Sequence, residues 1–71
     1  MSAVLEFYCI RNAQGLYYSY QSGRWETALA LSRTLILTLK GAQRYESYVK
    51  ASQPEEGAKL VRVRATLETV D

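Results

Sequence analysis

One run near the end of the chain alternates strictly between apolar and polar residues, and it constrains the fold more than any other feature. Its apolar members are Val61, Val63, Ala65 and Leu67, and its polar members are Arg62, Arg64, Thr66 and Glu68. A period of two is typical of a strand with one buried and one open face. The sequence therefore predicts a strand that begins near Lys59, in a sheet with one open face.

A β-hairpin is predicted for residues 3–21. Two segments rich in aromatic and β-forming residues flank Asn12-Ala13-Gln14-Gly15, which suits a turn. We expect Arg11 to pair with Leu16, which places Cys9 opposite Tyr18. On this register the core face carries Leu5, Phe7, Cys9, Leu16, Tyr18 and Tyr20, and the open face carries Glu6, Tyr8, Ile10, Tyr17, Ser19 and Gln21. A slip of one residue would invert this assignment.

The middle of the chain supports two interpretations. Apolar residues at helical spacing favour a single helix over residues 25–39, whereas the β-forming run of residues 34–39 favours a short helix followed by a strand. We favour the second. Residues 42–51 have the spacing of a helix face, and Pro54 and Gly57 mark a loop before the last strand.

These segments predict one α+β domain over residues 1–71. Its sheet has three to four mainly antiparallel strands, and one main helix packs on one face. Trp25 is expected to fill the end of the core. Tyr18, Tyr20, Tyr45 and Tyr48 are expected at the edge of the core, with buried rings and hydroxyls that reach water.

Composition argues against an enzyme. The chain has no histidine and one cysteine. It therefore lacks the usual general base, the usual partner of a nucleophile and a conventional zinc site, and we expect no cofactor and no metal. Cys9 is expected to be a buried, inert thiol, which fits a reducing compartment.

Charge and hydropathy bound the location and the partners. No apolar run approaches the length of a membrane span, and the first residues lack the pattern of a signal peptide, so we expect a cytoplasmic protein without a membrane partner. The formal net charge of +2 is too small to indicate nucleic acid by itself.

Several segments resemble a loose class of small uncharacterised bacteriophage and prophage proteins. They are residues 11–18, Trp25, residues 31–35, residues 40–44 and the last strand. The chain departs from that class at residues 34–37, where an alanine and an aromatic are more usual. The resemblance implies a compact, non-catalytic domain that acts on a host machine such as RNA polymerase, a nuclease or a defence complex, in the host cytoplasm.

The open sheet face is the predicted binding surface, with Tyr8, Tyr17, Arg62 and Arg64 as partner-binding residues. Tyrosine and arginine are enriched at protein interfaces, which favours a host protein as the partner. The same residues can stack bases and contact phosphates, so a nucleic-acid-binding module is an alternative. A homodimer that covers this face, or that extends the sheet through an unpaired edge, is another. Exposed strands also carry these residues for propensity and solubility alone.

Overall fold

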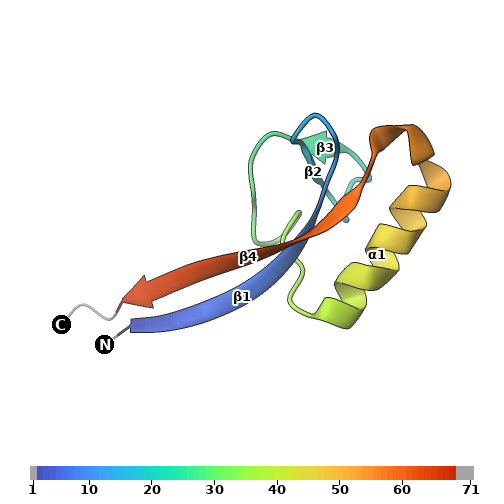
Figure 1. Cartoon of the computed structure of the whole chain (residues 1–71). Helices are drawn as coiled ribbons and strands as arrows, with labels where there is room; N and C mark the ends of the chain where they lie inside the picture. The colour runs from blue at the N-terminus through green and yellow to red at the C-terminus, as the bar shows by residue number, and fades with distance from the viewer. Residues whose placement is uncertain (1, 69–71) are drawn as a thin grey trace.

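The protein folds into an antiparallel sheet of four strands and one main helix (Figure 1). The structure is a computed structural model, and it describes residues 2–68. The elements in chain order are β1 (Ser2–Arg11), β2 (Tyr17–Tyr18), β3 (Trp25–Glu26), α1 (Leu39–Ser52), a 3-10 turn (Pro54–Glu56) and β4 (Lys59–Glu68). The strand order is β3-β2-β1-β4, so the prediction of a small α+β fold is confirmed.

The longest pairing joins the two ends of the chain. β1 and β4 run antiparallel without a bulge, from Ser2 opposite Glu68 to Arg11 opposite Lys59. The strand predicted from the alternating run is thereby confirmed, with its start at Lys59.

The N-terminal hairpin is much shorter than expected, and its predicted register is wrong. Arg11 pairs with Tyr17 and not with Leu16, and β2 has only two residues. The turn sets this register, because the Oδ1 atom of Asn12 accepts the backbone N–H groups of Gln14 and Leu16 at 3.0 and 2.8 Å. β2 pairs with β1 on one edge and with β3 on the other, while the opposite edge of β1 pairs along its whole length with β4.

Neither interpretation of the middle segment describes the structure fully. No helix forms over residues 26–32, where the hydroxyl of Thr34 accepts the backbone N–H of Ala30 at 2.7 Å and closes a turn. A Thr hydroxyl bonded to nearby backbone competes with helix formation in this way. Residues 34–39 supply only one bridge, in which Ile36 and Tyr8 exchange backbone hydrogen bonds of 2.7 and 2.8 Å.

The predicted main helix is confirmed and begins one turn earlier, at Leu39. Thr38 caps its N-terminus, because the threonine hydroxyl accepts the backbone N–H of Gly41 at 3.1 Å. Ala42 and Val49 are buried on the side of α1 that faces the sheet.

The core lies between α1 and one face of the sheet. Its buried members are Ile10, Tyr18, Ile36, Ala42, Val49 and Ala58, and Tyr8, Tyr20, Trp25 and Leu60 pack against them. The face assigned to the core from the sequence is therefore wrong for β1, since Tyr8 and Ile10 point toward α1. Cys9 lies on the opposite face and is nevertheless fully buried, as expected for an inert thiol. Trp25 packs against the core, as predicted.

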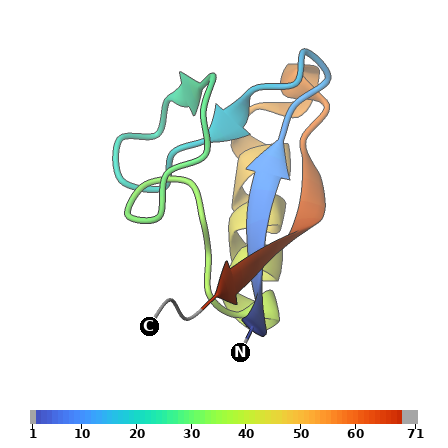
Figure 2. The ribbon, with the colours of Figure 1, turned by 90° about the vertical axis from the view of Figure 1, so that its left-hand side faces the viewer.

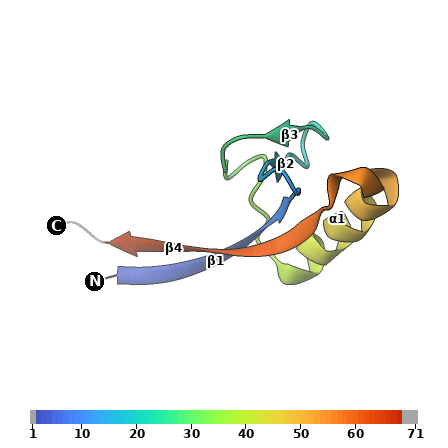
Figure 3. The ribbon, with the colours of Figure 1, turned by 45° about the horizontal axis from the view of Figure 1, so that its top comes forward.

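The N-terminal half of β1 and the C-terminal half of β4 form an arm that projects away from α1 and from β2 and β3 (Figures 1 and 3). The view in Figure 2 places this arm in front of the helix and beside the β2–β3 lobe. The molecule is accordingly elongated, with extents of 47 × 23 × 19 Å. Val4 and Leu5, both on β1 in this arm, are 61% and 41% exposed.

Candidate protein-binding surface

The residues predicted to bind a partner do not form one open surface. Tyr8 lies directly opposite Arg62, and their face is the one that carries α1. Tyr17 lies opposite Arg11 and so on the other face of the sheet. The expectation of an open face that displays Tyr8, Ile10 and Tyr17 together is wrong, because the helix covers the side on which Tyr8 and Ile10 lie.

Arg62 and Arg64 are exposed, in agreement with the alternating pattern. They lie toward the arm, and the Nε atom of Arg64 forms an ion pair of 3.3 Å with Glu6 across the β1–β4 ladder. Their role in binding stays a prediction.

A different surface gathers aromatic side chains beside an arginine. A depression of about 560 Å³, called the tyrosine groove below, lies between the end of β2 and the first turns of α1. Its lining residues are Tyr18, Tyr20, Gly41, Arg44, Tyr45 and Tyr48. Among these residues Arg44 carries the only formal charge, so the groove is apolar with one positive edge.

Helical spacing explains how four residues of α1 come to line the groove. Residues three and four apart lie on one side of a helix, so Gly41, Tyr45 and Tyr48 line one stripe and Arg44 stands beside it. Gly41 cannot readily be replaced, because a Cβ atom there would lie 2.9 Å from the Thr38 hydroxyl that caps the helix. The cap and the groove thus share one small residue.

Tyr18 and Tyr20 form the inner wall of the groove, and both contact other parts of the fold. The rings of Tyr20 and Tyr45 lie 5.6 Å apart, and the Tyr20 hydroxyl donates to the backbone carbonyl of Leu31 at 3.2 Å. Tyr18 packs edge-on against Trp25, with 5.5 Å between the ring centroids. Burial raises the pKa of Tyr18, and the nearby Tyr48 and Tyr45 act in the same direction.

The outer wall is exposed. Tyr48 and Tyr45 are 61% and 36% accessible to solvent, so the expectation of a buried ring is wrong for these two residues. Tyr18 and Tyr20, which are buried and partly buried, agree with it. The spacing of Gly41, Arg44, Tyr45 and Tyr48 on a predicted helix is visible in the sequence, but the contribution of β2 to the same groove is not.

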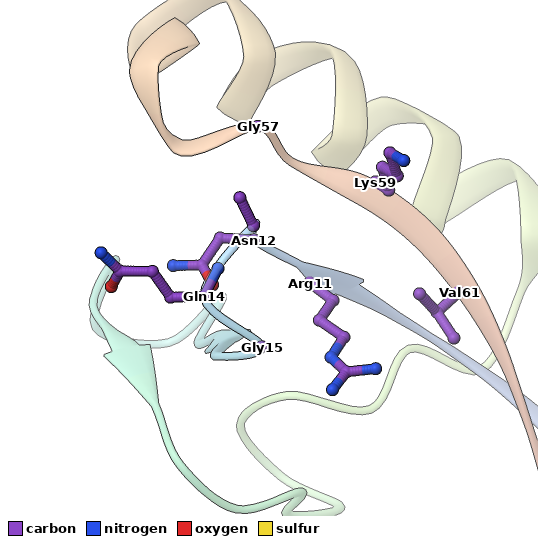
Figure 4. Close-up of a pocket in the computed structure, with 8 residues that line it drawn as sticks. Arg11, Asn12, Gln14, Gly15, Gly57, Lys59 and Val61 are labelled. Atoms are coloured by element: carbon purple, nitrogen blue, oxygen red, sulfur yellow. The ribbon is translucent and has the colours of Figure 1, made fainter.

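A second depression lies at the other face, at the turn between β1 and β2 (Figure 4). Its volume is about 690 Å³. Arg11 and Lys59, which are paired across β1 and β4, supply its positive charge, and the Arg11 guanidinium lies 5.7 Å from the centre of the Tyr17 ring. Gly57, with φ of 67°, lets the chain pass close to Ala13. Its two cations make this site, called the Arg11–Lys59 pocket, the more basic of the two depressions.

Comparison with known proteins does not place the chain in a family. No family model, curated protein or solved structure matches the chain. Over residues 2–68 no group of histidine, cysteine, aspartate and glutamate side chains is arranged to hold a metal ion. In the same part of the chain, every helix is too short or too polar to cross a bilayer.

Proposed function

We propose that this protein is a non-enzymatic binding protein that engages another protein through the tyrosine groove. One observation carries the proposal: Tyr48 and Arg44 are exposed beside the paired rings of Tyr20 and Tyr45. Tyrosine and arginine supply much of the binding energy at protein interfaces, because they combine a large apolar area with hydrogen-bonding ends.

The groove also specifies the chemistry of the partner. An apolar side chain can pack on the tyrosine rings that line the groove, and a carboxylate beside it can pair with Arg44. The rings of Tyr18 and Tyr20 are already held by contacts within the fold, so less conformational entropy is lost on binding than with mobile side chains. We therefore propose a partner that presents an apolar residue next to an acidic one.

The resemblance to small phage proteins supports a bacterial host protein as this partner. The protein would then act by occupying a surface of a host complex, such as RNA polymerase, a nuclease or a defence system, and so modulate or inhibit it. Such an action needs an accessible, preformed surface and no catalytic group.

The test is quantitative binding to host protein with matched variants. Tyr48→Ala and Arg44→Glu should each weaken binding of a partner isolated by pull-down from bacterial lysate about thirtyfold or more, as expected for residues that dominate an interface. Arg24→Glu makes the same charge change at an exposed residue on the β2–β3 turn, outside the groove, and should leave binding within about twofold. Unchanged binding by both groove variants, with native circular dichroism, would refute the proposal.

Nucleic acid is the second candidate, and the Arg11–Lys59 pocket favours it. The Arg11 guanidinium lies beside the ring of Tyr17, and Lys59 pairs with Arg11 across the sheet; cations and aromatic rings are the elements with which single-strand-binding surfaces contact phosphates and stack bases. Affinity for single-stranded oligonucleotides should fall steeply with salt, and Lys59→Ala should reduce that salt dependence by about one phosphate contact. No binding at low salt would eliminate this candidate.

A further inference from the structure

The outer edge of β4 is a long, regular and unprotected strand edge. Within residues 2–68, β4 is the last strand of the sheet, and no other strand pairs with its outer side. Its pairing with β1 runs without a bulge, and it contains no proline. Proteins usually protect such edges with bulges, prolines or covering loops, because a free edge recruits another strand.

The ladder pattern shows which backbone groups of β4 are free. Tyr8 directs its backbone N–H and C=O away from β4, to Ile36. In an antiparallel ladder the residue opposite Tyr8, which is Arg62, also directs these groups away from its partner. The even-numbered residues of β4 therefore point their N–H and C=O groups outward.

A contact at the start of β4 agrees with this pattern and limits the free edge. The backbone N–H of Leu60 is donated to Oε2 of Glu46 on α1, at 2.8 Å. The outward groups at Arg62, Arg64 and Thr66 have no such partner from the helix. The free edge therefore runs over residues 62–68, and its midpoint is Ala65.

The arm that bears this edge is exposed on both sides. A two-stranded ribbon without a third strand is marginally stable in water. Here the ribbon also exposes Val4 and Leu5, on opposite faces. A further strand along β4 would stabilise the arm, and it would extend the apolar face of Leu5, Phe7, Val63 and Ala65.

We propose that a second copy of this chain supplies that strand, with β4 pairing antiparallel to β4 of the second copy about a two-fold axis at Ala65. This register uses the whole free edge of both copies. It places Arg62 at the position opposite Glu68 of the second copy and Arg64 opposite Thr66, so no position pairs residues of like charge.

Neighbouring registers are less favourable. Shifting one copy by one residue along the other would bring outward-pointing backbone groups opposite inward-pointing ones, because only the even-numbered residues of β4 point outward. With the axis at Arg64, that residue would face its own copy, and with the axis at Val63, Arg62 would face Arg64 of the second copy. Like charges directly opposite each other destabilise a sheet. Charge therefore selects the Ala65 register over both of these.

Oligomeric state and amide exchange test the proposal together. Light scattering should show a concentration-dependent dimer. By NMR, the amides of Arg62, Arg64 and Thr66 should become protected as the dimer forms, whereas those of Val63 and Ala65 are protected by β1 at every concentration. A monomer at all concentrations, a dimer whose Arg62, Arg64 and Thr66 amides exchange freely, or protection that appears only with another protein would overturn it.

Two sets of variants separate pairing from folding. Thr66→Pro removes an outward N–H that β1 does not use, so the monomer should keep its circular dichroism spectrum while the dimer is lost. Arg62→Glu should weaken the dimer roughly tenfold, and Arg62→Glu combined with Glu68→Arg should restore it. A dimer that survives both Thr66→Pro and Arg62→Glu would refute the register. Arg44→Glu, in the tyrosine groove, should leave dimerisation unchanged.

Discussion

The indole Nε1 of Trp25 donates a hydrogen bond of 2.9 Å to Oε1 of Gln53. Gln53 is also the C-cap of α1, where its backbone N–H is donated to the carbonyl of Val49 at 2.7 Å. One residue therefore joins the short strand β3 to the end of the helix. Since β3 has only two residues, this contact and the edge-on packing of Trp25 on Tyr18 hold the β2–β3 lobe against the core.

Trp25→Phe should lower the unfolding free energy by at least about 1 kcal/mol, because the hydrogen bond is lost and the smaller phenyl ring fills less of the space that the indole occupies. For a domain of this size that corresponds to a fall in Tm of about 4–8 °C, measured by circular dichroism. Gln53→Ala should give a similar loss, and the double variant should add little to either. Gln53→Glu retains an acceptor and serves as the control. Fully additive losses would contradict a direct interaction.

Glu46 connects α1 to β4 through one carboxylate oxygen, which accepts the Leu60 backbone N–H at 2.8 Å and lies 3.4 Å from Nζ of Lys50. Glu46→Ala should lower the unfolding free energy by about 1–3 kcal/mol in urea denaturation, because a partly buried N–H loses a charged acceptor. Lys50→Ala should cost less than about 0.5 kcal/mol, since the ion pair is exposed. Equal losses in the two variants would show that the ion pair, and not the N–H bond, stabilises this junction.

Local patterns were sufficient to predict α1 and β4. Alternation over residues 59–68 and helical spacing over residues 42–51 each have one interpretation, and both elements formed where expected. β1 has no such single interpretation. Tyr8 and Ile10 on one side are about as apolar as Phe7 and Cys9 on the other, so hydrophobicity does not select the core face.

Tertiary contacts determine which face of β1 is buried in the core. The short connection through Gly57 returns the chain from α1 to β4, so the helix lies over the side of Leu60 and Ile10. The pairing of β1 with β4 joins the chain ends, and a pattern local to either strand does not identify its partner. Local patterns could not predict the tyrosine groove either, because Tyr20 and Tyr45 are far apart in the sequence and meet only in the folded chain.

Alkaline pH should destabilise the fold through Cys9 and Tyr18. Burial raises the pKa of the Cys9 thiol, with the charge of Arg11 acting in the opposite direction, and burial likewise raises the pKa of Tyr18. The folded state holds both protons more tightly than the unfolded state. The resulting stability is therefore complete below the ordinary thiol value of 9.0 and is lost as pH rises through the folded-state values.

Urea midpoints measured from about pH 7 to about pH 10 should show this decline. Cys9→Ala should lower stability at neutral pH, because it leaves a cavity, yet reduce the decline between neutral and alkaline pH. The contribution of Tyr18 should remain in that variant. An identical pH dependence in the wild type and Cys9→Ala would contradict a role for the thiol.

Asn12 organises the turn that ends β1. Its Oδ1 accepts two backbone N–H groups, from Gln14 and Leu16, and its Nδ2 donates to Oε2 of Glu56 at 3.0 Å. The residue is buried, so its loss leaves these groups without a ready replacement. The turn, β2 and the loop after α1 thus depend on one amide side chain.

Asn12→Ala should lower the unfolding free energy by about 2–4 kcal/mol, because several partly buried polar groups lose their partner at once. Asn12→Asp keeps the acceptor for Gln14 and Leu16 but places a carboxylate against Glu56, so it should also destabilise the protein. Combining Asn12→Asp with Glu56→Gln restores a donor opposite the carboxylate and should recover most of that loss. Chemical denaturation of the three variants measures the effect. If Asn12→Asp and the double variant are equally unstable, repulsion from Glu56 is not the cause.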